Sequence, residues 1–193
     1  LKLGTVKNTI SAEQVAAIST DLWHMPKVIL DTLHHNDEIL RLSELFVEKQ
    51  HCLFLGRGTH FPIALEGALK LKEISYIHAE GYAAGELKHG PLALVDNDMP
   101  VVILAPQDDM LDKLKSNMEE VQARGGELFV FADENSGIKA KDRQHVVHIP
   151  AVNAVLAPIV YSIPVQLLSY HVAVLRGTDV DQPRNLAKSV TVE

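Results

Sequence analysis

Lys70, Glu73 and His89 are side chains that could move protons, and they lie close together in the sequence. Lys70 and Glu73 are three positions apart, so a helix would make them neighbours on one surface. His89 is an imidazole that titrates near neutrality, and the Gly90-Pro91 pair that follows it ends a helix. A carboxylate base, an adjacent cation and an imidazole are the groups needed to move protons around a carbonyl compound. Their spacing alone does not show that the three converge.

A structural alternative exists for the charged residues of this segment. Glu66, Lys70 and Glu73 have the spacing i, i+4 and i+7, which is typical of a solvated helix face of mutually supporting charges. The rest of the segment is apolar, and the small residues Gly67 and Ala68 allow close approach of another element. Taken in isolation, the pattern favours the solvated face, and the surrounding sequence adds modest support for a site.

From Cys52 onward, short apolar runs alternate with helical patterns. Such an alternation predicts an α/β fold with a parallel sheet covered on both faces. We expect a three-layer α/β/α, flavodoxin-like domain with five strands, whose ligand lies at the carboxyl ends of the strands, where residues 56–59 and the 80s segment should be found. The predicted strands are 52–55, 77–80, 101–105, 128–132 and 146–149, and the predicted helices are 62–74, 83–88, 109–124 and 154–176.

The two ends of the chain differ from this pattern. Ser11 is a suitable N-cap for a helix that continues to Leu33, and a second helix is predicted over 37–49. The last residues, 177–193, lack helical periodicity, and their composition alone favours a solvated terminus. We therefore expect an N-terminal helical arm (1–50), a central domain (51–176) and a C-terminal tail (177–193).

The composition excludes several classes of protein. The chain has 193 residues, 47% of them hydrophobic, and a net charge of -7, which argues against nucleic acid or an anionic membrane as the main partner. No secretory signal is recognisable, and the apolar run near the C-terminus is interrupted by prolines, so a cytoplasmic protein is expected.

The lone Cys52 excludes an internal disulfide, and its apolar surroundings favour a buried strand residue over a nucleophile. Leu1 in place of methionine suggests a piece of a longer polypeptide.

The sequence disfavours two kinds of ligand site, one for a dinucleotide and one for a metal ion. Gly56-Arg57-Gly58 resembles part of a dinucleotide fingerprint, but Phe61 occupies the position of the third glycine, so a tight strand-to-helix turn is favoured. His145, His148 and His171 show no metal-ligand spacing with a nearby Cys, Asp or Glu, and His34-His35 is typical of a capping or surface pair at a helix end. We expect neither a cofactor nor a metal.

Three blocks of sequence, taken together and in this order, carry a specific resemblance. Residues 64–80 read ALEGALKLKEISYIHAE, residues 85–94 read GELKHGPLAL, and residues 179–193 read DVDQPRNLAKSVTVE. They resemble the C-terminal part of the glutamine–fructose-6-phosphate aminotransferase (isomerising) family, the glucosamine-6-phosphate synthases. The likeness extends over nearly the whole chain and corresponds to the second of two sugar isomerase (SIS) lobes.

The resemblance implies an activity and a set of roles. In that family a glutaminase domain releases ammonia, and two SIS lobes convert fructose 6-phosphate to glucosamine 6-phosphate. Glu73 resembles the base that moves a proton between C1 and C2, and Lys70 resembles its positioning partner. His89 resembles the ring-opening imidazole, which the neighbouring subunit of a homodimer contributes. Lys188 resembles the lysine that forms a Schiff base with the sugar, and Ala187 lines the same pocket.

The chain also departs from the family pattern. It contains no glutaminase nucleophile, and it lacks the first SIS lobe with the Ser/Thr-rich loop that grips the sugar phosphate. We therefore expect a fragment that is inactive by itself. The rival hypothesis is a stand-alone phosphosugar-binding module with a regulatory role, against which the missing phosphate grip counts. A dinucleotide-binding domain is a third and weaker idea.

Overall fold

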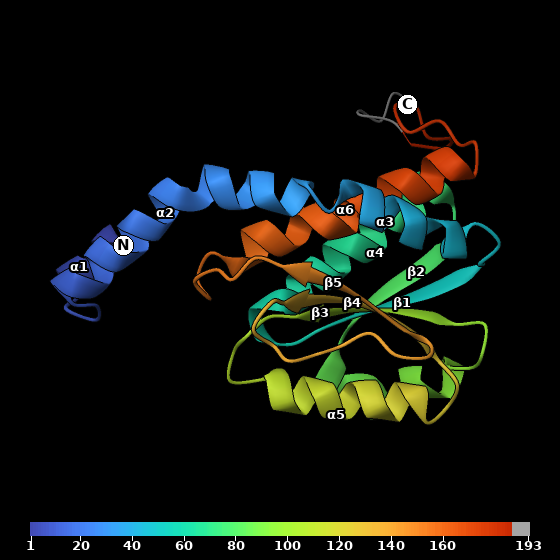
Figure 1. Cartoon of the computed structure of the whole chain (residues 1–193), viewed down its shortest axis with the longest axis horizontal. Helices are drawn as coiled ribbons and strands as arrows, with labels where there is room; N and C mark the ends of the chain where they lie inside the picture. The colour runs from blue at the N-terminus through green and yellow to red at the C-terminus, as the bar shows by residue number, and fades with distance from the viewer. Residues whose placement is uncertain (187–193) are drawn as a thin grey trace, which may run out of the picture.

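The computed structural model describes residues 1–186 and confirms the five-stranded parallel sheet (Figure 1). The strand order is β2-β1-β3-β4-β5, and every neighbouring pair is parallel. This order is that of the flavodoxin-like doubly wound sheets. The strands are β1 (His51–Gly56), β2 (His78–Ala83), β3 (Pro100–Ala105), β4 (Glu127–Asp133) and β5 (Gln144–Ile149).

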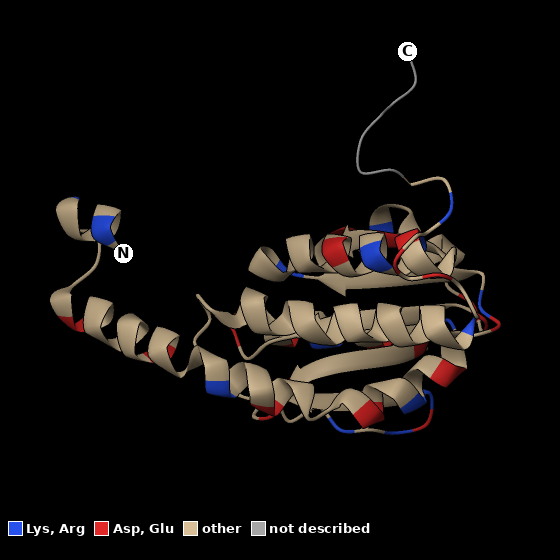
Figure 2. Ribbon diagram, turned by 90° about the horizontal axis from the view of Figure 1, so that it is seen from above, with Lys and Arg blue, Asp and Glu red and all other residues tan. Residues whose placement is uncertain are grey.

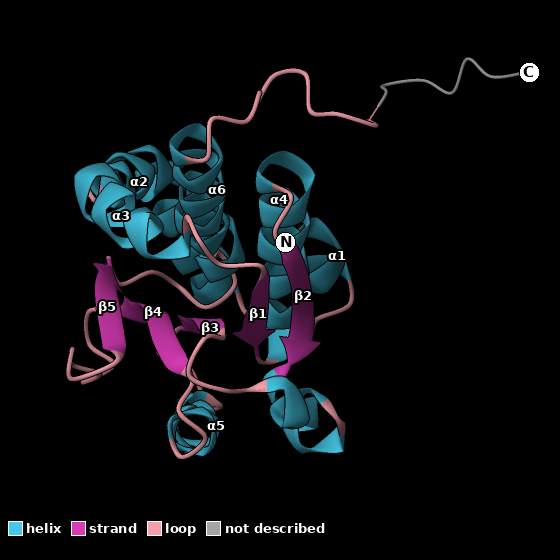
Figure 3. Cartoon of the chain, turned by 90° about the vertical axis from the view of Figure 1, so that its right-hand side faces the viewer, coloured by secondary structure: helices cyan, strands magenta, loops and turns pink. Residues whose placement is uncertain are grey.

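Helices cover both faces of the sheet, which gives the expected three layers (Figure 3). The helices α4 (Phe61–Ser75), α6 (Ala157–Leu175) and α3 (Asn36–Ser43) pack on one face. On the other face lie α5 (Leu111–Gln122) and the short 3₁₀ segments η3 (Ala84–His89) and η4 (Pro91–Leu94). Because both faces are covered, the central strands are almost wholly apolar and buried.

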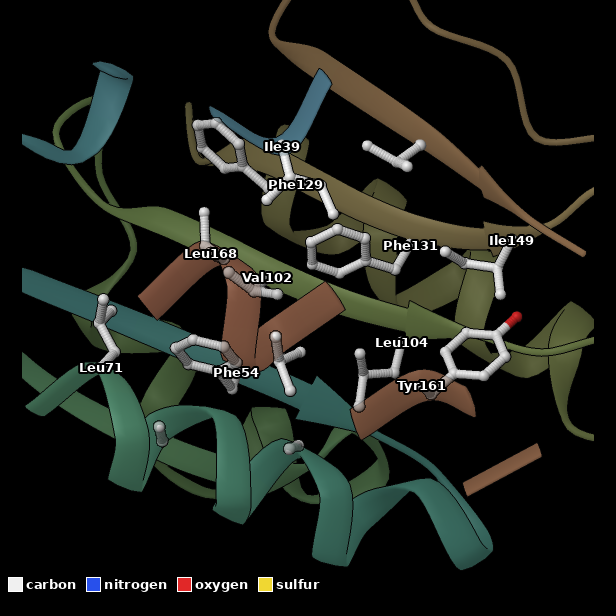
Figure 4. Close-up of a cluster of buried hydrophobic side chains, with 14 of the residues drawn as sticks. Ile39, Phe54, Leu71, Val102, Leu104, Phe129, Phe131, Ile149, Tyr161 and Leu168 are labelled. Carbon is white, nitrogen blue, oxygen red and sulfur yellow. The ribbon is translucent and has the colours of Figure 1, made fainter. Parts of the chain in front are cut away.

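The larger of the two hydrophobic cores lies between the sheet and the α4–α6 layer (Figure 4). Phe54, Phe129, Phe131 and Tyr161 are almost completely buried there. Helix α6 contains no charged residue, as Figure 2 shows, because it packs against α4, α3 and part of α2. Its length and apolar composition would also suit a membrane span, but half of it is buried inside the domain, as expected of a core helix.

The first long helix of the N-terminal segment begins where the sequence predicts. Helix α2 (Ala12–Leu33) begins with a capping box, in which Ser11 accepts from the Gln14 amide and Gln14 accepts from the Ser11 amide. Its first half projects away from the sheet (Figure 1). It is preceded by α1 (Lys2–Val6), a short helix that the sequence did not predict and that buries no side chain.

The helix predicted over 37–49 is shorter in the structure. Helix α3 ends at Ser43, and a 3₁₀ turn over Glu44–Phe46 follows. That turn places Phe46 against Phe129, with 4.5 Å between their ring centroids. The carbonyls of Val47 and Lys49 accept hydrogen bonds from Arg176 at 2.9 Å each. These tertiary contacts therefore end the helix at Ser43, although the apolar periodicity of the sequence continues beyond it.

Candidate functional site

Lys70 and Glu73 form an ion pair on the last turns of α4. Lys70 Nζ lies 2.8 Å from Glu73 Oε2, and the two side chains are 35% and 28% exposed. The hydrogen bond to Glu73 raises the pKa of Lys70, and the charges of Glu73 and Glu66 act in the same direction. The pair is therefore partly buried, unlike the solvated face that the charges taken alone would favour.

This pair does not lie at the edge of the sheet where the sequence led us to expect a ligand. Helix α4 begins at the carboxyl end of β1 and must return to the opposite edge of the sheet, where the parallel strand β2 begins. Residues 70–73 lie in its last turns, so they are near the amino edge. Residues 56–59 and the 80s segment do follow β1 and β2 at the carboxyl edge, as expected, whereas this pair lies toward the opposite edge.

The described part of the C-terminal tail crosses from α6 to the end of α4 (Figure 3). A cavity of about 620 Å³ lies between the two. Lys70, Glu73 and Ile74 line one side of it, and residues 180–183 with Leu186 line the other. The tail lies against α4 as far as residue 186, but most of its described residues are exposed, as its composition favours.

Two of the predicted site residues, Ala187 and Lys188, lie outside the described residues. Leu186, which lines the cavity, immediately precedes them in the sequence.

His89 is not brought to this cavity within one chain. It ends η3, and η3 packs with α5 on the face of the sheet opposite α4. Its side chain is 72% exposed, and its Nδ1 lies 2.6 Å from Glu86 Oε2. The structure therefore unites Lys70 and Glu73 with the tail and leaves His89 on a separate, accessible surface.

Tyr76 and Arg184 line a second cavity beside the first, and sequence reasoning did not select either residue. This cavity, of about 370 Å³, also contacts Glu73. The Tyr76 hydroxyl accepts a hydrogen bond from the Arg184 backbone amide at 2.9 Å. The Arg184 guanidinium lies 4.1 Å from the centroid of the Tyr76 ring. The sequence holds one indication of the role of Tyr76: the predicted helix 62–74 ends near this bulky aromatic residue, without the glycine that commonly ends a helix.

Cys52 is a buried residue of β1, as the sequence analysis favoured. It is 1% exposed, and burial raises the pKa of its thiol well above the usual value. A thiolate is the nucleophilic form of cysteine, so this residue is unsuited to nucleophilic catalysis.

Backbone geometry explains the two glycines, Gly56 and Gly58, in the turn after β1. A Cβ at Gly56 would lie 2.2 Å from the carbonyl oxygen of His60, and Gly58 has a positive φ of 52°. Gly56 is therefore required for steric reasons and the conformation of Gly58 favours glycine, as expected for a tight turn.

The buried imidazole of His60 lies next to this turn. It is 1% exposed, packs edge-on against Tyr161 with 4.8 Å between centroids, and its Nε2 has no hydrogen-bond partner among residues 1–186. Burial lowers the pKa of His60 to about 4, although the charge of Asp108 opposes the shift.

We expect His60 to make the fold sensitive to acid. The unfolded chain takes up a proton below its ordinary pKa of 6.5, whereas the folded chain resists until about pH 4, so stability falls as the pH drops through this range. The loss should reach about 3 kcal/mol at pH 4. Urea unfolding of wild type and His60→Phe at pH 6.5 and pH 4 measures it, because the substitution keeps a ring against Tyr161 and removes the titration. Equal losses in the two proteins would contradict this assignment.

Comparison of the sequence with known proteins gives high similarity over the whole chain. It is 88% identical over 193 residues, all of the chain, to glutamine–fructose-6-phosphate aminotransferase (isomerising) of Acinetobacter baylyi, of which it covers 32%. It is 61% identical over 182 residues, 92% of the chain, to the Escherichia coli protein of the same name, of which it covers 30%. The chain therefore spans about a third of the length of these curated relatives.

Solved structures and the family comparison agree with this result. The C-terminal domain of glucosamine-fructose-6-phosphate aminotransferase from Francisella tularensis superposes with a TM-score of 0.89 and 50% identity, covering 92% of this chain and 50% of that one. A phosphosugar isomerase from Salmonella typhimurium, described as putative, has a TM-score of 0.73 at 14% identity and supports the fold alone. Residues 44–176, most of the chain, match the SIS domain family. The chain therefore belongs to the SIS domain family.

Proposed function

We propose that this chain is the second SIS lobe of a glutamine–fructose-6-phosphate aminotransferase (isomerising). The whole enzyme would convert fructose 6-phosphate and glutamine to glucosamine 6-phosphate and glutamate. The observation that carries the proposal is the cavity between α4 and the tail, because it places a carboxylate and an ammonium beside the segment that leads into Lys188. The 88% identity to the Acinetobacter baylyi protein supports the same function.

In this proposal the two sides of the cavity have distinct tasks. Lys188 forms a Schiff base with the open-chain sugar, and the resulting iminium acidifies the adjacent C–H bond. Glu73 moves the proton between C1 and C2, and the Lys70 ammonium holds the Glu73 carboxylate in place through their 2.8 Å contact. The tail, with Ala187 in the lining, covers the sugar and excludes water.

His89 is assigned to a second subunit. Its exposed position on the opposite face of the sheet suits a group that opens the sugar ring in a neighbouring chain of a homodimer. The proposal also includes a partner SIS lobe that grips the sugar phosphate, a glutaminase domain that supplies ammonia, and a cytoplasmic location. The division into an arm (1–50), a SIS domain (51–176) and an active-site tail (177–193) belongs to the same proposal.

We expect the isolated 193-residue chain to show no turnover of fructose 6-phosphate and glutamine, because a single lobe contains neither the phosphate grip nor the ammonia source. A chimera in which this chain replaces the matching third of the Acinetobacter baylyi enzyme should turn over at a rate close to that of the parent. Glucosamine 6-phosphate formation measures both. A folded but inactive chimera, or an active isolated chain, would contradict the proposal. Tight binding of fructose 6-phosphate by the isolated chain in calorimetry would instead favour a regulatory module.

A further inference from the structure

Tyr76 occupies a backbone conformation that disfavours its own residue type. It follows the last residue of α4 with φ 64° and ψ 15°, in the left-handed region. Helices commonly end with a residue in this conformation, and that residue is usually glycine because a Cβ is strained there. A bulky aromatic residue at this position needs a compensating role for its side chain.

The side chain makes two contacts with one tail residue. The hydroxyl accepts from the Arg184 amide at 2.9 Å, and the ring faces the Arg184 guanidinium at 4.1 Å. The first contact fixes the backbone, and the second, a cation–π interaction, fixes the side chain. Both residues line the cavity that also contacts Glu73. The proposed base and this anchor therefore belong to one continuous surface.

A second anchor holds the start of the tail. The Thr178 hydroxyl lies 2.6 Å from the Ile74 carbonyl oxygen at the end of α4 and 2.9 Å from the Ala173 carbonyl oxygen near the end of α6. Between the two anchors, the Asp179 carboxylate accepts from the amides of residues 181 and 182 at 2.9 Å each. The tail is thus tied to the domain at Thr178 and again at Arg184.

The Tyr76–Arg184 anchor sets the reach of the residues that follow. Lys188 is four residues beyond Arg184 and ten beyond Thr178. An extended chain spans about 3.5 Å per residue, so losing the Tyr76 anchor lengthens the tether from about 14 Å to about 35 Å. The effective concentration of a tethered group falls roughly as the −3/2 power of tether length, which corresponds to about a fourfold loss here before orientation is counted.

We propose that Tyr76 is a positioning residue that seats the tail through Arg184, so that the amine of Lys188 is delivered to the sugar beside Glu73. This inference rests on the proposed function. Tyr76 touches no reacting atom in it and acts through the tail alone. The prediction is therefore a defect in tail order and in turnover, without loss of the fold.

The first experiment measures the tail directly, without catalysis. In the ¹⁵N-labelled 193-residue chain, Tyr76→Phe removes the acceptor of the Arg184 amide, whose exchange rate with solvent should rise about tenfold. Tyr76→Gly should do the same without lowering the midpoint of urea unfolding, because glycine is unstrained at φ 64°. Tyr170→Phe is the matched control, since Tyr170 is a 47% exposed tyrosine of α6. An unchanged Arg184 exchange rate in Tyr76→Gly would overturn the anchor.

The second experiment uses the chimera and separates the anchor from the function. Tyr76→Gly should lower kcat at least about fourfold with little change in KM for fructose 6-phosphate, and Tyr76→Phe, which keeps the ring under Arg184, should recover part of the loss. A released tail with unchanged kcat would overturn the positioning role while the proposed function stands. Normal turnover in a Glu73→Gln chimera would overturn the proposed function, and the positioning role with it.

Discussion

Glu73→Gln in the chimera is expected to lower turnover of fructose 6-phosphate by about 10²- to 10⁴-fold, the range that a positioned acid or base contributes. Glutamine keeps the size of the side chain and its ability to accept a hydrogen bond from Lys70, but it cannot take up the proton. The lesion should therefore appear in kcat more than in KM. Formation of glucosamine 6-phosphate under saturating glutamine is the measurement.

The matched control for this prediction is Glu66→Gln. Glu66 lies two turns before Glu73 on the same helix and is hydrogen-bonded to Gln166 at 3.3 Å, but it does not line the cavity. Its replacement should change turnover by less than about threefold, because a partly exposed charge outside the cavity contributes little. If the two substitutions lower turnover equally, the base is not Glu73. Far-ultraviolet circular dichroism of both variants shows whether the fold is retained.

Mixing two inactive variants should restore activity if His89 works across a subunit boundary. Glu73→Gln removes the proposed base, and His89→Asn removes the proposed ring-opening group, so each homodimer lacks one function at both of its sites. In a mixed dimer the intact Glu73 of one chain can meet the intact His89 of the other. Random exchange makes half of the dimers mixed, with one complete site in each, so about a quarter of the wild-type rate should return.

The experiment needs subunits that have exchanged. Coexpression of the two chimeras with different affinity tags, followed by purification on both tags, isolates the mixed dimer. This species should reach about half of the wild-type rate, because one of its two sites is complete. A mixed dimer as inactive as its parents would mean that His89 acts within its own chain, and an active His89→Asn homodimer would mean that His89 has no role. Action of His89 within its own chain would require a rearrangement, because His89 lies on the face of the sheet opposite α4.

The sequence predicted the sheet well because its strands are defined by local composition. The runs at 101–105 and 128–132 are entirely apolar and are strands in the structure within two residues of the expected limits. The Ser11 cap was predictable for the same reason, since its hydrogen-bond partner is three residues away. An element can be predicted from the sequence when the residues that stabilise it lie within the same short segment.

The candidate site was harder to predict because its contacts join distant segments. Lys70 and Glu73 were found from their spacing, but their edge of the sheet depends on the direction of α4. The packing of the tail depends on Tyr76 and Arg184, which are 108 residues apart. Composition indicated that residues 177–186 are solvated, and most of them are exposed, but it could not show that the hydroxyl and ring of Tyr76 hold this segment in place. The end of α3 was misplaced for a similar reason, the contacts of Arg176 with the chain after it.

The hydroxyl of Thr178 has a mechanical consequence. It lies within hydrogen-bond distance of the last turns of two helices at once, so it links the end of α4 to the end of α6. While this link holds, a movement of the C-terminal segment must begin after Thr178, and it leaves both helices undisturbed.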